Sequence, residues 1–354
     1  MKTRLYALVM ATMLLFVPLL SVEASSSSRV PGDIVIQFPD PNFEAAVRKT
    51  IGKPTESITA TDVAGITALD VNGLYITDLT GIEYFTALEK LSCEWNGLTE
   101  LDVSQNTMLT ELFCSGNQLV ALNVRENPAL TKLLCFDNLL ATLDVSHNPA
   151  LTLINCGDNQ LTSLDMSHNP ALIELYCSDN SLTTLNVTLS PKLEKLSCEW
   201  NELAELDVSQ NTMLIELFCS GNLLTTLDLR HNPALMELVC LDNQLTTLDL
   251  RHNPALTGLA CMVNQLTTLD VSHNLALTGI NCDDNQLTTL DVSHNPALIE
   301  LYCRNNSLTV LDISFNPALE VLDVYNNLFP DKSAIIGLDE NKLKYFVFDS
   351  EDDL

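Results

Sequence analysis

The sequence has little positive charge. Its 354 residues include 17 lysines and arginines against 46 aspartates and glutamates, so the formal net charge is −29 at pH 7. Such an acidic chain repels phosphate backbones, and we therefore do not expect nucleic acid as a partner. Basic proteins and divalent cations remain compatible with this charge, as does a simple role of the acidic surface in solubility.

Long apolar runs are also scarce: the sequence has a single one, and it lies at the N-terminus. Residues 5–20 are apolar, follow the basic Lys2 and Arg4, and are succeeded by a few small and β-branched residues. This pattern predicts a secretory signal peptide over residues 1–24, and the run is short for a membrane anchor. We expect no membrane span in the mature chain, which would be secreted or held at the cell surface.

The usual signatures of an enzyme are missing. There is no glycine-rich phosphate loop and no C-x-x-C pair. Serine and histidine are adjacent in the recurring SHNP segment, but neighbours on a strand point to opposite faces and cannot act as nucleophile and base. The remaining acid–base candidates belong to repeated columns, which do not make one unique site. The sequence predicts no catalytic activity.

What the sequence has in abundance is repetition. The chain has 11 cysteines, and successive ones are always 21 residues apart: Cys93, Cys114, Cys135, Cys156, Cys177, Cys198, Cys219, Cys240, Cys261, Cys282 and Cys303. The unit 130–150 has the sequence LTKLLCFDNLLATLDVSHNPA. The general pattern is L-x-x-L-x-C-x-x-N-x-L-T-x-L-D-V-S-x-N-P-A. A fixed period of this length is the signature of a solenoid.

The segment L-x-x-L-x-C-x-x-N-x-L resembles the leucine-rich repeat family. In such a unit the leucine and cysteine at the fourth and sixth places alternate inward on a short strand, and stacked units bury a continuous core. The asparagine at the ninth place can bond the backbone through its side chain and tolerates a tight turn. The second half of the unit repeats this pattern of an inward pair followed by an asparagine, as in Leu143, Val145 and Asn148.

These patterns predict a β-rich solenoid of the leucine-rich repeat class, with strand-like segments on both sides of each coil. Because the two halves of a unit have nearly equal length, we expect the solenoid to be flatter than one backed by helices. Residues 25–65 would form an N-terminal segment with a helical cap, and residues 66–339 about 13 repeat units. Residues 340–354 would form a capping strand and an acidic tail.

The N-terminal cap has its own signals. The segment FPDPNFEAAVRKTIGKP predicts a short helix with Asp40 as N-cap and Pro41 as first residue. Thr59 and Asp62 have the spacing of a capping box for a second short helix. Together, residues 34–87 resemble the cap and first repeat of bacterial internalin-like secreted proteins. That resemblance implies a surface that binds a partner through the outward face of the first-strand sheet.

Three columns of side chains could carry chemistry. The cysteines occupy an inward place and are expected to be buried free thiols, although bridges between coils and metal binding are alternatives. The six histidines precede the second turn asparagine and are either exposed turn residues, a zinc site or a pH sensor. Aspartate recurs at the fifteenth place, where it either accepts hydrogen bonds from nearby backbone and hydroxyl groups or binds calcium.

The outward places of the first strand vary between units, whereas those of the second strand are monotonous. Large apolar groups in the variable places have no core to explain them, and they indicate interface anchors more than ordinary strand propensity. The predicted ligand-binding residues are Trp95, Phe113, Phe136, Tyr176, Trp200, Phe218, Leu241, Met262, Tyr302 and Tyr325.

The two tryptophans occur in identical LSCEWN hexapeptides. Trp95 and Phe113 recur as Trp200 and Phe218, five units and therefore about 24 Å further along the solenoid. Copying of a block of units explains this recurrence. The functional alternative is a surface that offers the same aromatic pair twice to a repetitive or dimeric partner.

The sequence thus predicts a secreted or cell-surface protein that binds a protein or glycan through its first-strand face, without a cofactor. The alternative is a structural or calcium-dependent component of the cell envelope that uses the aspartate column for assembly.

Overall fold

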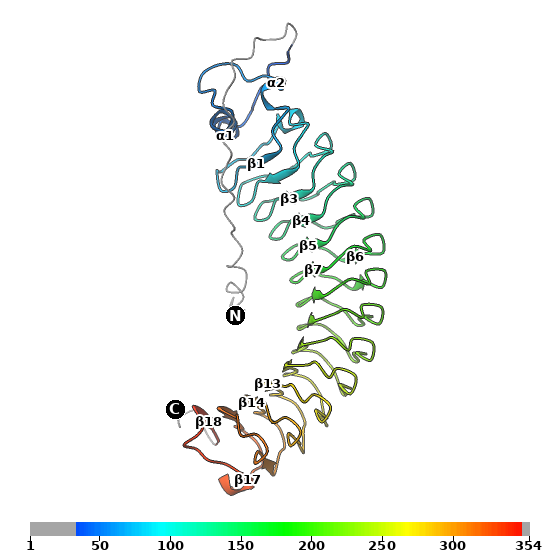
Figure 1. Ribbon diagram of the computed structural model, residues 1–354, viewed down its shortest axis with the longest axis vertical. Helices are drawn as coiled ribbons and strands as arrows, with labels where there is room; N and C mark the ends of the chain where they lie inside the picture. The colour runs from blue at the N-terminus through cyan, green and yellow to red at the C-terminus, as the bar shows by residue number, and fades with distance from the viewer. Residues whose placement is uncertain (1–32, 349–354) are drawn as a thin grey trace.

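The computed structural model describes residues 33–348, which form a curved solenoid of about 13 coils. One sheet of 14 parallel strands runs along its inner, concave side, and the second half of each coil forms the outer side (Figure 1). The fold class predicted from the repeats is confirmed. The expected signal peptide, residues 1–24, lies outside the described residues.

The inner sheet takes one three-residue strand from each coil. Successive strands pair 21 residues apart through most of the sheet, as in Leu112 opposite Leu133. In spatial order the strands are β1 (Ala68–Asp70), β2 (Lys90–Ser92), β3 (Glu111–Phe113), β4 (Lys132–Leu134), β5 (Leu153–Asn155), β7 (Glu174–Tyr176), β9 (Lys195–Ser197), β10 (Glu216–Phe218), β11 (Glu237–Val239), β12 (Gly258–Ala260), β13 (Gly279–Asn281), β14 (Glu300–Tyr302), β16 (Val321–Asp323) and β18 (Tyr345–Val347).

The outer side also contains strand-like segments, as expected, but they are regular only in places. Two pairs form there: β6 (Ser163–Asp165) with β8 (Thr184–Asn186), and β15 (Leu311–Asp312) with β17 (Ile335–Ile336). Elsewhere the outer ladder is reduced to single bridges between residues 102 and 123 and between residues 270 and 291.

At the fifteenth place the aspartate Oδ1 accepts the backbone N–H two residues on, as Asp144 does from Ser146, at 2.9 Å. The same bond is present where the outer strands are regular, as at Asp165 and Asp312, so it does not explain the gaps in the outer ladder. The two sides are not equivalent, and the solenoid curves with its continuous sheet inside (Figure 1). Whether it is flatter than a helix-backed solenoid stays a prediction.

The N-terminal cap matches its sequence signals. Helix α1 (Pro41–Ile51) begins after Asp40, whose carboxylate accepts the N–H groups of Asn42 and Phe43. The other oxygen of Asp40 accepts the N–H of Thr77, at 2.7 Å, and so ties the helix to the first repeat. The capping box of Thr59 and Asp62 starts the short helix α2 (Ala60–Val63). A 3₁₀ turn, η1 (Ile82–Tyr84), precedes the first full unit.

The far end of the core is covered by an aromatic segment. After the 3₁₀ turn η2 (Lys332–Ala334), strand β18 pairs with β16 and closes the inner sheet. Phe348 is 7% exposed and lies 6.1 Å, centroid to centroid, from Phe329. Within residues 33–348, no helix combines the length and apolar character needed to cross a membrane.

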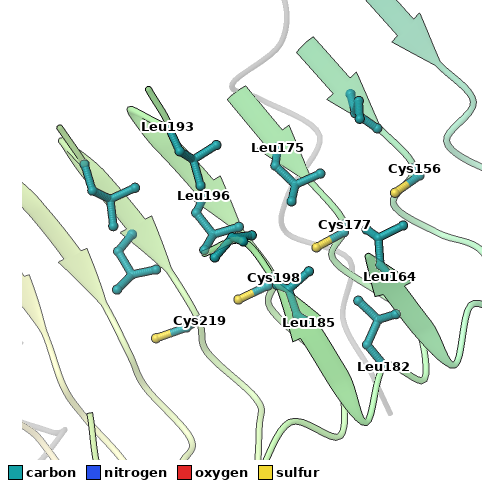
Figure 2. Close-up of a cluster of buried hydrophobic side chains, with 14 of the residues drawn as sticks. Cys156, Leu164, Leu175, Cys177, Leu182, Leu185, Leu193, Leu196, Cys198 and Cys219 are labelled. Atoms are coloured by element: carbon teal, nitrogen blue, oxygen red, sulfur yellow. The ribbon is translucent and has the colours of Figure 1, made fainter. Parts of the chain in front are cut away.

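The core is a stack of identical layers. Leucines at the first, fourth, eleventh and fourteenth places and the cysteine at the sixth place are buried in nearly every coil. Figure 2 shows Cys156, Cys177, Cys198 and Cys219 on successive coils with their sulfur atoms directed into the same interior. All 11 cysteines are buried and unbridged, as the sequence predicted. Burial raises their thiol pKa values, that of Cys156 to about 12.

Two buried asparagine columns join the coils. At the ninth place, Asn117 Oδ1 accepts the N–H of Leu98 in the preceding coil, and its Nδ2 donates to the carbonyl of Cys93. At the nineteenth place, Asn127 Nδ2 donates to the carbonyls of Val103 and Asn106. These side chains satisfy backbone groups at turns where the chain cannot pair with itself.

Replacing one asparagine of the second column should weaken the whole solenoid. Asn211 is fully buried and donates to the carbonyls of Val187 and Ser190, at 2.9 and 2.8 Å. Asn211→Ala leaves both carbonyls unpaired, which we expect to cost about 1–3 kcal/mol in the free energy of unfolding. Urea denaturation measures this cost. Asn211→Ser, which copies the natural Ser190, should cost less, and equal stability of the three proteins would contradict the assignment.

Candidate binding surface

The ten residues predicted to bind a ligand all lie on the solvent side of the inner sheet or on the turn that follows it. None of them is fully buried. Phe113, Tyr176, Phe218 and Tyr302 end strands β3, β7, β10 and β14, and each is partly exposed. Trp95 is the most open of the ten, with 55% of its surface exposed.

The turn after each inner strand forms a second row of side chains, which we call the rim. It consists of the residues at the eighth place of the repeat, and each has a positive φ, between 49° and 65°. Glycine, aspartate and asparagine occupy most of the rim places, with glycine at Gly116 and Gly221. These residue types tolerate a left-handed backbone best. The exceptions are Trp95, Trp200 and Val263.

These three residues are held at a conformational cost. A left-handed conformation costs a non-glycine residue on the order of 1–3 kcal/mol, and a β-branched residue is an outlier there. Burial does not compensate for this cost in full, because Trp95 is 55% and Val263 41% exposed. The rim therefore displays three apolar side chains at places where the fold favours glycine, asparagine or aspartate.

The two tryptophan rings are seated in the same way. A Cβ atom at Gly116 would lie 2.3 Å from Cε3 of Trp95, and one at Gly221 would lie 2.2 Å from Cε3 of Trp200. Each ring thus rests directly on the backbone of the next coil, where only glycine leaves room. Trp95 also meets Phe136 edge to face, with centroids 5.7 Å apart. The recurrence of tryptophan therefore includes the recurrence of its glycine seat.

A glutamate precedes each tryptophan. Glu94 and Glu199 are half-buried at the end of the inner strands, and burial raises the pKa of both carboxyl groups. The nearby hydroxyl groups of Ser115 and Ser220 oppose this pKa shift in part. The residue that precedes each tryptophan in the chain thus has a poorly solvated carboxyl group.

The cations of the inner face are already paired. Lys90 and Lys132 both contact Glu111, at 2.9 and 3.0 Å, and Lys195 contacts Glu216 at 2.9 Å. The Lys90 ammonium also lies 4.8 Å from the Phe113 ring centroid. Since carboxylates outnumber these lysines on the face, the pairs leave it acidic.

The N-terminal end of the face is bounded by a cleft of about 700 Å³ between α1 and the first two strands. Its lining residues are Asn42, Ala45, Ala46, Lys49, Thr50, Ala68, Leu69, Asp70, Leu74, Lys90 and Ser92. Sequence reasoning did not predict this cleft, because the position of α1 over the sheet is a tertiary feature.

The C-terminal end holds a buried acidic group. Asp283 is 8% exposed and accepts the N–H of Arg304 at 2.7 Å. The neighbouring Asp323 is 2% exposed and lies 3.8 Å from the Arg304 guanidinium. Burial, with repulsion from Asp323, raises the pKa of Asp283 to about 6.

The recurring aspartates on the outer side have a structural role. In addition to Asp144, the carboxylates of Asp102, Asp207 and Asp291 each accept the backbone N–H of the serine two residues on. These bonds lower the carboxyl pKa values, and they confirm the hydrogen-bonding interpretation of the column. In the part of the chain that the structure describes, no three histidine, cysteine or acidic side chains are grouped so as to hold a metal ion.

Comparisons with known proteins agree with this geometry. A family model described as leucine-rich repeat matches residues 304–324. Internalin J of Listeria monocytogenes serotype 4b is 38% identical over 71 residues, which are 20% of this chain and 8% of that protein. The solved functional domain of InlJ from Listeria monocytogenes is 40% identical. The match covers 88% of this chain and 74% of that one, with a TM-score of 0.78.

The chain is an internalin-like leucine-rich repeat protein. The solved InlJ domain is described as including a cysteine ladder, and the buried column of 11 cysteines is the corresponding feature here. A second internalin, InlF of the same species, shares the fold at 18% identity, with a TM-score of 0.68 over 89% of this chain and 96% of that one. The sequence alignment with Internalin J spans less than a tenth of that protein.

Several features of this internalin-like protein escaped sequence reasoning. The glycine seats, the half-buried glutamates and the Asp283 group all depend on contacts between coils. One signal was available, because glycine, aspartate and asparagine dominate the eighth place. That composition indicates a left-handed turn, against which Trp95, Trp200 and Val263 stand out.

Relieving the strain at Val263 should stabilise this internalin-like solenoid. Val263→Asn places in the rim the residue found at Asn305 and Asn326, and we expect a gain of about 1 kcal/mol in the free energy of unfolding. Val239→Asn makes the same exchange on strand β11 and should destabilise. Thermal and urea denaturation compare the two variants, and a similar loss in both would refute the strain argument.

The raised pKa of Asp283 predicts a pH dependence of stability. A carboxyl whose pKa is about 6 in the folded state and near 3.8 when unfolded holds its proton more tightly in the fold. Its contribution is fully present below pH 4 and is lost as the pH rises through 6. Asp283→Asn should therefore raise the melting temperature at pH 7.5 but not at pH 4. Parallel melting profiles of the two proteins across this range would show that Asp283 is not responsible.

Proposed function

We propose that this internalin-like protein is secreted or displayed at a cell surface, where it binds a protein partner through the inner sheet face and its rim. The observation that carries the proposal is the set of exposed aromatic side chains on that face, which the core does not use. Aromatic anchors on one surface are typical of the energetic centre of a protein interface. A glycan partner was an equal expectation from the sequence.

Several features support this choice. The inner face has the only continuous ladder among the described residues, and rigid strands hold the outward side chains in fixed relative positions. Its residues vary from coil to coil, so each coil can present a different contact to the partner. The similarity to internalins supports a binding role and an extracellular location. The binding partners of internalins do not identify the partner of this chain.

A binding role accounts for the chain better than a catalytic one. Contrary to the expectation from the sequence, adjacent serine and histidine side chains do meet on the outer side, as Ser146 Oγ and His147 Nδ1 do at 3.0 Å. The same exposed pair recurs in three other coils, so it forms a repeated column and not one unique site. The alternative, a calcium-dependent envelope component, relies on the aspartate column. That column is already engaged by backbone N–H groups, which weakens the alternative.

A paired affinity capture tests the proposed function. One bait is residues 25–354, and the other carries Phe113→Ala, Tyr176→Ala, Phe218→Ala and Tyr302→Ala on the sheet face. Removal of even one interface anchor costs about 2 kcal/mol, so the Kd for the captured protein should rise about 30-fold or more. Mass spectrometry identifies the captured protein, and titration with that purified protein measures the Kd.

The matched control truncates four exposed apolar residues away from the face: Val120, Leu189, Leu275 and Phe315. This control bait should bind as the unaltered one does. Equal binding by all three baits would place the interface elsewhere on the molecule.

A further inference from the structure

The rim contains apolar side chains that the fold does not need. Trp95, Trp200 and Val263 have left-handed backbones; Trp95 and Val263 are exposed and Trp200 is partly exposed, while Asn305 and Asn326 form the same turn with a residue type that tolerates it better. The corresponding glycine of the first repeat, Gly73, adopts the same left-handed turn with no side chain over it, so the turn itself does not require a tryptophan ring. Local strain that folding does not require points to a role in binding.

Carboxylates lie between these apolar side chains. Asp137, Asp158 and Asp179 separate Trp95 from Trp200 along the rim, and Asp242 lies between Trp200 and Val263. Among the described residues, the ion pairs include none to Asp137, Asp158 or Asp242. The nearest cations of the face, the lysines on β2, β4 and β9, are bound to Glu111 and Glu216.

The tryptophan seats are preorganised for a cation. Each ring is fixed against the next coil and remains at least partly exposed, and the residue before it is the half-buried Glu94 or Glu199. An ammonium or guanidinium group is attracted both by the face of an indole ring and by a poorly solvated carboxylate. An anionic ligand would meet only repulsion here.

We propose that the rim from Trp95 to Val263 binds an extended, basic segment of a protein partner, in which arginine or lysine side chains alternate with apolar ones. This inference rests on the proposed function and specifies its partner. Eight coils separate the two ends, a length of about 38 Å, which an extended segment of about 12 residues spans. Cations of the partner contact the aspartates and the tryptophan faces, and its apolar groups contact the three rim anchors.

The two tryptophans provide the test, because the chain has no others and both lie on the rim. The probe is an amidated 12-residue peptide in which arginine alternates with leucine, and its control has glutamine in place of arginine. The arginine peptide should shift tryptophan emission and reduce acrylamide quenching about twofold or more, with saturation. No protection, or equal protection by the glutamine peptide, would overturn the proposal.

Charge variants locate the site. Asp137→Asn, Asp158→Asn and Asp242→Asn together should weaken binding of the arginine peptide about tenfold. The matched control makes the same exchange on the outer side, at Asp102, Asp144 and Asp207, where Asn123 and Asn186 already occupy the column. That control should change the Kd less than twofold. Equal weakening by both variants would mean that only the net charge matters and would refute a rim site.

Binding of the captured natural partner to a rim variant tests this inference separately from the proposed function. A rim variant with Trp95→Asn, Trp200→Asn and Val263→Asn should keep its melting temperature within a few degrees, since asparagine suits the left-handed turn. It should bind the captured partner at least 30-fold more weakly. If this variant binds normally while the sheet-face variant does not, the proposed function stands and the rim inference fails.

Discussion

In nearly every coil two asparagine side chains bond the backbone of the preceding coil, and the solenoid depends on them. A coil of 21 residues must turn twice, and at each turn the backbone loses its partners in the ladder. Asn117 and Asn127 show how the amide groups replace those partners at the two turns. Because these bonds recur at the same separations of 19, 21 and 24 residues, the cysteine-containing coils share one length, and leucine and cysteine columns form as a consequence.

This constraint divides the surface into places that the scaffold determines and places that it leaves free. The outer turns are built by aspartate, serine and asparagine bonding the local backbone, so they repeat with little variation. The inner strands already have their backbone groups paired in the sheet, and their outward side chains are unrestricted. The rim is an intermediate case, because its left-handed backbone favours three residue types but does not exclude others. Tryptophan at two rim places is therefore informative in a way that an exposed phenylalanine on a strand is not.

The charge of this surface favours partners of the opposite sign. The chain has a formal net charge of −29, and the lysines of the inner face are held in pairs with glutamates. Exposed pairs of this kind contribute little to stability, but they remove the available cations from the face. An approaching partner therefore meets apolar groups and carboxylates, and the long-range field favours a basic surface.

The sequence by itself determined the architecture, because the 21-residue period, the inward leucine and cysteine places and the turn asparagines are each readable from local rules. It also determined the caps, where Asp40 and the pair of Thr59 and Asp62 act within a few residues of themselves. Tertiary structure alone decided which contacts form between coils. The seating of Trp95 on Gly116, the burial of Asp283 and the uneven outer ladder all involve residues about 21 positions apart, and their energies depend on stacking. A repeat pattern specifies that coils stack, whereas the side chains that then meet decide what the surface can bind.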